Sequence, residues 1–508
     1  MAKDPAMKKT LILFLLLGLF VVLVRLPSLG VFDKDSGAIA YHARQILEGQ
    51  PLYSTHHPNH HLPGAFYTYA AIFALLGDQF TSVKITLVFW VWLNAWVIYL
   101  IGRKAGGDLG GMLASVFFVL ATALPSLHGD TAEIEQFANL PLSLTILAAA
   151  HILTERKPAR WYLLVGILGG ISLLYKVTFV HALAAAGITL LVVTIRLRDR
   201  SAWAALYKAG SYALAGFAAP LAAVAAYFAA VGAWPGLMLV FQLGAGYVGR
   251  LDSPLYNILL FPLFLAARAN LVLTILGLVG AVQVARKFGH AIEREPATGP
   301  VRLMLVVWLV TSVIVAGISR FPFVYYGLLV VPALSLLAGT EIGQLWERSR
   351  GERPLAWVAA VFAIAIIANG IFVSRQYLGA YLQYRLGNIP EKTFLQEGPT
   401  NGRAHLESLE IADYVRSRSA PDDLIFVWSD NVQIYYFSGR RTPAYLLWPH
   451  YLDETAITQA LAKKPLYVIV APKIVFNVPI DYLLREMSGG YALETVTGGH
   501  QVFRRTAP

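Results

Sequence analysis

The chain has 508 residues, of which 57% are hydrophobic and only 14% are charged. Soluble globular proteins carry about a quarter charged residues, so this composition excludes a soluble protein and indicates that much apolar surface faces lipid. The absence of cysteine excludes disulfides and thiolate metal sites. A net charge of +11 would suggest nucleic acid in a soluble protein. In a membrane protein, Lys and Arg beside the spans explain it, and no nucleic-acid partner is expected.

Apolar runs of about 20 residues, the length that crosses a bilayer, predict eleven membrane spans. The first run is not followed by a small-residue cleavage site, so we expect it to be an anchor. The predicted spans are 10–26, 82–102, 109–126, 136–153, 161–175, 178–195, 209–231, 269–285, 303–318, 322–343 and 355–373.

The charges between the spans predict the orientation. With a cytoplasmic N-terminus, the inner segments hold about nineteen Lys and Arg and the outer segments about six, as the positive-inside rule requires. An odd number of spans then places the C-terminal residues outside the cytoplasm. The expected location is the inner or plasma membrane, with many passes.

Two of the predicted outer segments are long. In the first, residues 27–81, the stretch Ser36–Glu48 predicts a helix capped by Asp35 and Ser36 and closed by Gly49. A second stretch, Leu62–Leu76, predicts a short apolar helix at the membrane interface. Residues 232–268 predict another interfacial segment. Long outer connections and short inner ones suggest that the protein works on its outer face.

From about residue 376 the chain becomes richer in charge and in short β runs. We therefore expect a transmembrane domain over 1–375 and a soluble extracytoplasmic α/β domain, with a mostly parallel sheet, over 376–508. The absence of a G-x-G-x-x-G or P-loop pattern leaves no prediction of nucleotide binding. The predicted strands are Leu424–Trp428, Ala444–Leu447 and Leu466–Val470, and the predicted helices are Ala404–Arg418 and Glu454–Lys463.

Carboxylates in the outer loops are candidates for a general base. Asp35 follows the first span, although helix capping is an equally good role for it. Glu133 and Glu135 lie in a connection that also contains Asp130 and no cation. Acidic residues at a span boundary are costly unless they are partnered or hydrated. Glu135 is expected to point into a cavity, whereas Asp130 fits a solvated loop.

Two cations and a group of histidines raise binding hypotheses. Lys176 and Arg320 stand between apolar stretches, where they either snorkel to the interface or bind a lipid phosphate. The histidines suggest a metal site, but they lie in a Pro-broken loop without helical spacing, and no metal is expected. A divalent cation stays open as an alternative. The histidines are His42, His56, His57, His60 and His61.

An ordered set of stretches carries a family resemblance. The stretches are Asp35-Ser-Gly-x-x-x-Tyr41, Ile46–Tyr53, Leu62–Tyr67, Gly102-Arg103-Lys104, Glu135–Pro141, Tyr175-Lys176-Val-Thr, Phe321–Tyr326 with Pro332, and Pro421–Trp428 with Tyr435–Arg440. Together they resemble the polyprenyl-phosphate-sugar-dependent glycosyltransferases of the GT-C superfamily. That superfamily includes protein O-mannosyltransferases and lipid A aminoarabinose transferases.

The resemblance implies a GT-C fold: a polytopic bundle of about eleven transmembrane helices with interfacial helices and a small outer α/β domain. It also implies one inverting displacement at an anomeric carbon, with Asp35 as the base and Glu135 and Glu133 as further candidates. Lys176 and Arg320 would neutralise the departing lipid phosphate. The partners would be a polyprenyl-phosphate sugar donor, a protein, glycolipid or polysaccharide acceptor, and membrane lipids. Further substrate contacts are expected from Tyr41, His61, Arg250, Tyr325 and Tyr326.

The chain also departs from the family pattern. The usual Asp-Glu pair appears as Asp35-Ser36, and the usual Lys-Pro-Pro appears as His61-Leu62-Pro63. A non-catalytic GT-C-like protein is therefore one alternative. A lipid or saccharide transporter or flippase is the other, although no inverted repeat of broken helices is visible and the acids cluster in outer loops.

Overall fold

A computed structural model describes residues 5–197, 200–248, 254–294, 298–318, 323–348, 353–471 and 476–506. The chain divides into two compact units. The bundle unit comprises Met1–Leu29, Ile85–Ala225 and Tyr247–Leu378, and the sheet unit comprises Gly30–Lys84, Ala226–Gly246 and Gly379–Pro508.

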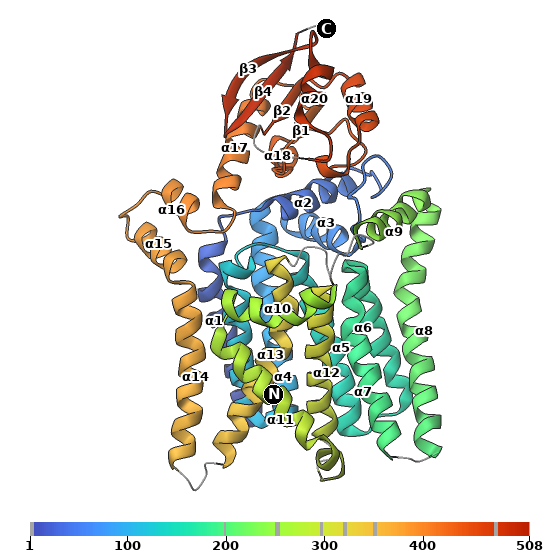
Figure 1. The fold of residues 1–508 in the computed structure, drawn as a ribbon, viewed down its shortest axis with the longest axis vertical. Helices are drawn as coiled ribbons and strands as arrows, with labels where there is room; N and C mark the ends of the chain where they lie inside the picture. Colours follow the sequence, from blue (N-terminus) through green and yellow to red (C-terminus); the bar gives the residue numbers. More distant parts are fainter. Residues whose placement is uncertain are drawn as a thin grey trace. The chain divides into compact units, whose positions relative to one another are not determined.

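Long apolar helices build the bundle unit (Figure 1). Eight helices among the described residues are long and apolar enough to cross a membrane. Each of the eleven predicted spans overlaps a helix, which confirms the polytopic helical fold. The helices are α1 (Pro5–Arg25), α4 (Phe80–Thr122), α5 (Ile134–Glu155), α6 (Tyr162–Tyr175), α7 (His181–Leu197), α8 (Arg200–Ala230), α10 (Pro254–Arg268), α11 (Leu271–Arg294), α12 (Gly299–Gly317), α13 (Gly327–Arg348) and α14 (Arg353–Val373). The shorter helix α15 (Arg375–Arg385) contains the boundary at Leu378 and belongs mostly to the sheet unit.

Helix α4 contains two of the predicted spans because it breaks at a glycine pair. Gly106 and Gly107 leave the helical region, and Gly107 has a φ of 76°, which glycine adopts without steric cost. The two arms then pack against each other. The hydroxyl of Ser115 donates to the Ala95 carbonyl at 2.8 Å, and a Cβ on Gly111 would lie 2.5 Å from the Tyr99 carbonyl oxygen.

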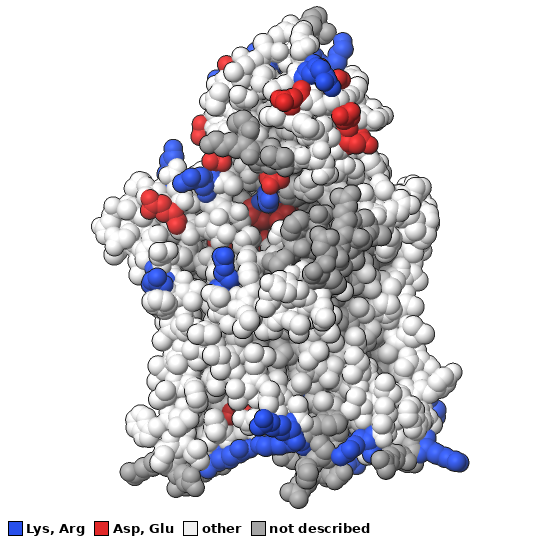
Figure 2. Space-filling model, in the orientation of Figure 1, with Lys and Arg blue, Asp and Glu red and all other residues white. Residues whose placement is uncertain are grey.

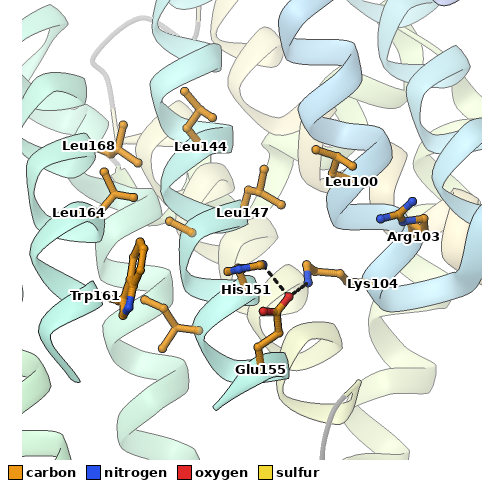
Figure 3. A pocket seen from close by; sticks show the side chains of 12 residues that line it. Leu100, Arg103, Lys104, Leu144, Leu147, His151, Glu155, Trp161, Leu164 and Leu168 are labelled. Carbon is orange, nitrogen blue, oxygen red and sulfur yellow. Dashed lines mark ion pairs between the residues drawn. The ribbon is translucent and has the colours of Figure 1, made fainter. Parts of the chain in front are cut away.

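Basic side chains gather at one end of the bundle unit, where Figure 2 shows them as a band. The break in α4, the last turn of α5 and the start of α12 meet at this end. Lys104 lies 3.5 Å from Glu155, and Arg302 donates to the Ala105 carbonyl at 2.8 Å. A cavity of about 400 Å³ opens between α4, α5 and α6 beside this band (Figure 3).

A four-stranded sheet organises the sheet unit, in the order β1-β2-β4-β3. The strands are β1 (Ile425–Trp428), β2 (Tyr467–Val470), β3 (Tyr491–Thr497) and β4 (His500–Arg505). The structure confirms two of the predicted strands, as β1 and β2, which pair in parallel. The prediction of a mostly parallel sheet is wrong, because β4 pairs antiparallel with both β2 and β3. The predicted strand Ala444–Leu447 is also wrong, since it makes only an isolated bridge from Leu446 to His57.

Helices cover the sheet and extend the unit. The sheet core contains Phe426, Trp428, Val468, Val470 and Ile457. The two predicted helices of the C-terminal region are confirmed as α17 and α19. The helices are α2 (Lys34–Leu47), α3 (Gly64–Leu76), α9 (Trp234–Val248), α16 (Glu391–Glu397), α17 (Gly402–Arg416), α18 (Gln433–Ser438), α19 (Glu454–Ala462) and α20 (Ile480–Met487).

The first long predicted loop is an integral part of the sheet unit, because α2 packs directly on α18. A Cβ on Gly37 would lie 2.2 Å from the Cβ of Gln433, so only glycine permits this approach. Arg44 donates to the Tyr436 carbonyl at 2.8 Å and to Asp78 at 2.5 Å. These contacts fix α2 to the C-terminal residues.

Candidate active site

An ammonium group lies at the end of the bundle unit opposite the basic band. Lys176 is an extended residue between α6 and the short helix η4 (Val177–Val180). Its Nζ lies 3.4 Å from Glu135 Oε1 and 3.0 Å from the Tyr326 hydroxyl oxygen. The same nitrogen lies 4.2 Å from the centre of the Tyr326 ring. The ammonium is therefore held in one place by a carboxylate, a hydroxyl and an aromatic face.

Burial makes this ion pair costly, because both charged groups lose part of their hydration. The Glu135 side chain is 3% exposed and that of Lys176 is 22% exposed. Glu135 stands in the first turn of α5, where the helix dipole favours a negative charge. A buried ion pair is weak evidence for stability, since desolvation opposes the attraction. A pair of this kind at a helix end is therefore better explained by a function.

Aromatic residues join this pair to a second carboxylate. Tyr325 and Tyr326 belong to the short helix η5 (Val324–Tyr326), and their rings meet edge to face at 4.9 Å. The Tyr325 ring lies 5.8 Å from that of His128. The Nδ1 of His128 lies 3.4 Å from Glu133 Oε1. The structure thus places Glu133, Glu135, Lys176, Tyr325 and Tyr326 along one continuous set of contacts.

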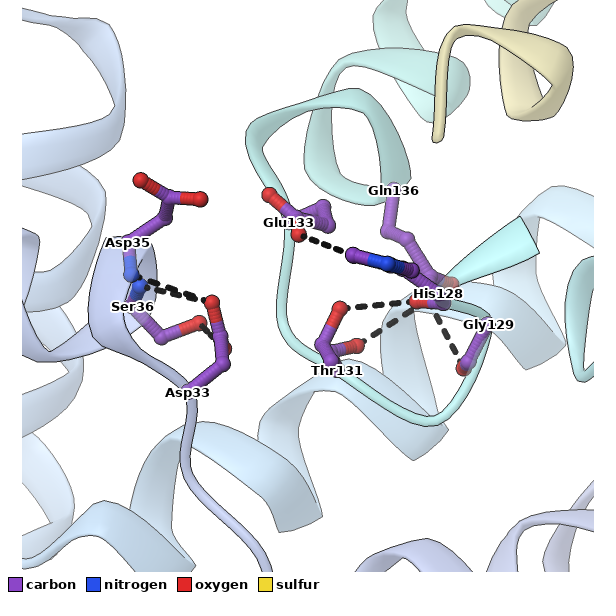
Figure 4. A network of polar contacts seen from close by, with 8 residues as sticks. All are labelled: Asp33, Asp35, Ser36, His128, Gly129, Thr131, Glu133 and Gln136. Carbon is purple, nitrogen blue, oxygen red and sulfur yellow. Dashed lines mark hydrogen bonds and ion pairs between the residues drawn. The ribbon is translucent and has the colours of Figure 1, made fainter. Parts of the chain in front are cut away.

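The loop that carries the two glutamates is held by a buried arginine. Arg25, at the end of α1, donates to the carbonyls of Gly129 at 2.5 Å and Thr122 at 2.8 Å and to Gln136 Oε1 at 2.8 Å. The side-chain nitrogen of Gln136 in turn donates to the carbonyls of Gly129 and Thr131, at 2.9 and 3.0 Å (Figure 4). These hydrogen bonds fix the loop against the ends of α1 and α4 and so position its two glutamates.

Two sequence inferences change at this loop. Sequence patterns do not identify Arg25 as a candidate, because an arginine at the end of an apolar run usually snorkels to the interface. Asp130, expected in a solvated loop, is buried with 1% of its surface exposed. That prediction is wrong, because the loop folds back on the helix ends that Arg25 connects.

In the sheet unit, the acid that caps α2 is Asp33. Its carboxylate accepts from the backbone nitrogens of Asp35 at 3.1 Å and Ser36 at 3.2 Å, and from the Ser36 hydroxyl (Figure 4). The prediction that Asp35 and Ser36 cap the helix is wrong, because the cap lies two residues earlier. Asp35 is half-buried in the first helical turn. The neighbouring Lys34 pairs with Asp430 at 3.2 Å.

Tyr41 and His61 take part in contacts within the sheet unit. Tyr41 is buried, and its hydroxyl accepts from the Thr442 backbone nitrogen at 3.2 Å. Burial raises the pKa of Tyr41. The His61 carbonyl accepts from the Tyr53 hydroxyl at 2.8 Å, and its ring stands 4.3 Å from that of His60. Two further predicted contacts, Arg250 and Arg320, lie outside the described residues.

Two histidines of the first loop, His56 and His57, lie against backbone carbonyls. The Nε2 of His56 lies 3.0 Å from the Thr442 carbonyl oxygen, and that of His57 lies 2.7 Å from the Gly236 carbonyl oxygen. Burial lowers the pKa of His42, His56 and His57. Neutral rings bound to carbonyls are the arrangement expected of packing residues.

Comparison with known proteins agrees with this architecture. Residues 56–222 match the family model described as dolichyl-phosphate-mannose-protein mannosyltransferase. No curated protein matches the chain. The crystal structure of ArnT from Cupriavidus metallidurans bound to undecaprenyl phosphate is similar, with 17% identity over 98% of each chain and a TM-score of 0.61. Its apo form gives 16% identity over 98% of each chain and a TM-score of 0.58.

A third solved structure is similar over most of the chain. The oligosaccharyltransferase from Archaeoglobus fulgidus, in the apo form, has 14% identity over 91% of this chain and 69% of its own, with a TM-score of 0.50. At these identities the likeness is one of fold. The chain has the GT-C fold that the ordered motifs predicted.

Proposed function

We propose that the chain is a glycosyltransferase that moves a sugar from a polyprenyl-phosphate donor to an acceptor on the outer face of the membrane. The observation that carries this proposal is the ammonium of Lys176, fixed beside Glu135 and Tyr326 at the non-basic end of a GT-C fold. The undecaprenyl phosphate bound to ArnT and the description of the matching family model both support a lipid-phosphate donor.

Lys176 would bind the phosphate of the donor. As the bond to the sugar breaks, negative charge grows on the phosphate, and a preorganised cation stabilises that charge in the transition state. Charge-assisted hydrogen bonds to phosphate are among the strongest that a side chain forms. Glu135 holds the ammonium in position, and Arg320 is proposed as a second cation. With protein cations in this role, the reaction needs no metal.

Asp35 would act as the base. The acceptor oxygen or nitrogen attacks the anomeric carbon, the bond from that carbon to the phosphate oxygen breaks, and the lipid phosphate leaves with the electron pair. The acceptor proton passes to the Asp35 carboxylate, and the configuration inverts. Because Asp33 is the residue that caps α2, the Asp35 carboxylate is not required for the cap. The acceptor would be a protein, a glycolipid or a polysaccharide.

Binding of undecaprenyl phosphate to the full chain in nanodiscs tests the first step without knowledge of the acceptor. We expect Lys176→Met to weaken binding at least tenfold, because the phosphate loses its fixed charge. Lys208→Met, which removes an exposed lysine, is the matched control and should bind like the wild type. Equal binding by the wild type and Lys176→Met would refute the phosphate site.

Transfer of radiolabelled sugar tests the base. With a polyprenyl-phosphate sugar donor and a panel of acceptors, Asp35→Asn should retain undecaprenyl phosphate binding and lose at least a hundredfold in turnover. An Asp35→Asn protein with wild-type turnover would remove Asp35 from the mechanism.

A further inference from the structure

The cavity between α4, α5 and α6 is separate from the candidate site. It lies along the part of α5 that ends at Glu155, whereas Glu135 stands in the first turn of the same helix. Its volume of about 400 Å³ is within the range of pockets that hold small ligands. The lining comes from α4, α5, α6 and the short helix η3 (Ala159–Trp161).

The cavity changes character along its length (Figure 3). Leu100, Leu144 and Leu168 line one end, farther from the basic band. Lys104 and His151 line the other end, with Glu155 below them. A ligand that matches this lining has an apolar tail and a polar head, and the head lies at the ends of the helices.

The polar end carries more positive than negative charge. Glu155 is the carboxylate in the lining. Three basic side chains lie within ion-pair distance of it: Lys104 at 3.5 Å, His151 at 3.0 Å and Lys157 at 3.1 Å. Lys104 Nζ also donates to the Thr154 hydroxyl at 3.1 Å, which holds it against α5. Among the described residues, no carboxylate lies within ion-pair distance of Arg103, whose guanidinium stands 5.7 Å from the Tyr99 ring centre.

We infer that this cavity binds an anionic phospholipid of the leaflet at the basic end of the bundle. The acyl chains would lie along the leucines, and the headgroup phosphate would be bound by Arg103 and Lys104. Trp161 lines the cavity and is 45% exposed, which suits a tryptophan at the level of the headgroups. Basic pockets between membrane helices are the setting in which anionic headgroups bind.

Snorkelling alone does not account for this arrangement. A snorkelling lysine extends its stem along apolar surface and keeps its ammonium in water. Lys104 is instead half-buried, with its ammonium on Thr154 and Glu155 beside a cavity. The zwitterionic headgroup of phosphatidylcholine carries its own cation, so a site with surplus positive charge favours phosphatidylglycerol over it.

Native mass spectrometry of the full chain tests this site with dioleoyl-phosphatidylglycerol and dioleoyl-phosphatidylcholine as probes. The wild type should bind one phosphatidylglycerol at least tenfold more tightly than phosphatidylcholine, since each basic residue near a membrane surface contributes about fivefold. Arg103→Gln with Lys104→Gln should abolish the preference. Arg196→Gln removes an exposed arginine in the last turn of α7 and should preserve it.

A second variant fills the cavity without changing its charge. Ala148→Trp should exclude the lipid while leaving Arg103 and Lys104 in place. Inorganic phosphate, added as a competitor, should not displace the lipid, because it lacks the tail. Equal affinity of the wild type for the two lipids would overturn the inference. So would an equal loss of the lipid preference in Arg196→Gln, full lipid binding by Ala148→Trp, or displacement of the lipid by inorganic phosphate.

Discussion

At the scale of single residues, the pair of Lys176 and Glu135 is the most informative feature. A buried carboxylate that loses its cation leaves an uncompensated charge, at a cost of about 3–5 kcal/mol. We therefore expect Lys176→Met to lower the melting temperature of the purified chain. Replacement of both partners, as Lys176→Met with Glu135→Leu, should restore most of that stability and none of the undecaprenyl phosphate binding. Thermal unfolding of the three proteins in one detergent measures this.

The outcome separates a functional pair from a structural one. If the double apolar variant is as unstable as Lys176→Met, the charges support the fold. If the double variant is stable and still binds undecaprenyl phosphate, the two charges are needed neither for the fold nor for phosphate binding.

The sequence predicted which residues of this cluster are functional candidates, but it did not predict which residues they contact. Glu135 is predictable because an acid that opens an apolar run needs a partner. The partner itself is not, since Lys176 is 41 residues away along the chain and Tyr326 is a further 150 from Lys176. Arg25 was missed for the same reason: its acceptors lie 97 to 111 residues away. A local sequence pattern predicts which side chain is a candidate, whereas its contact partner depends on how distant segments of the chain pack together.

At the scale of elements, the close approach of α2 to α18 depends on one glycine. Gly37→Ala would place a Cβ 2.2 Å from that of Gln433, so one helix has to move. We expect a loss of about 1–3 kcal/mol, the usual cost of overpacking. Gly210→Ala, in α8, is the matched control, because nothing lies within 4 Å of its Cβ position. It should be neutral or stabilise by up to about 1 kcal/mol, as alanine favours helix.

Limited proteolysis of the sheet unit reports the difference between these two variants. We expect Gly37→Ala to be cleaved faster than the wild type and Gly210→Ala to be cleaved at the wild-type rate. Equal rates in both would mean that α2 and α18 adjust without cost.

The elements that the sequence missed lack the pattern on which prediction relies. β3 and β4 follow one another across Gly498 and Gly499, and most side chains of β3 are partly or fully exposed, so no buried alternation marks it. Ala444–Leu447 was wrongly predicted as a strand because it is apolar. It packs through its side chains and forms only an isolated bridge, from Leu446 to His57. The cap of α2 was misplaced because Asp33, Asp35 and Ser36 are all good capping residues.

At the scale of the whole molecule, the sheet unit should be sensitive to acid. Burial lowers the pKa of His405 to about 4 and lowers those of His42, His56 and His57 from 6.5. The unfolded chain takes up protons on these rings as the pH falls through 6.5, whereas the folded chain does so only at lower pH. Their contribution to stability is therefore complete above pH 6.5 and is lost as the pH falls towards 4.

Melting temperatures at pH 7.5 and pH 5 measure this effect, because most carboxylates stay ionised over that range. We expect a lower melting temperature at pH 5 and a smaller difference in His405→Leu. A chain that is equally stable at both values would show that these rings do not control unfolding.

The sheet unit is assembled from three separated parts of the chain, and this affects its biosynthesis. The Tyr41 hydroxyl and Arg44 meet backbone partners 401 and 392 residues later in the sequence. At translation rates of about 5–20 residues per second, the N-terminal part waits on the order of tens of seconds for those partners. During that interval the faces of α2 and α3 that later become buried are uncovered, so we expect folding of the sheet unit to depend on chaperones or on the insertion machinery. A chain that stops before α18 is then a target for proteolysis. Expression of residues 379–508 alone would leave exposed the face of α18 that packs on α2.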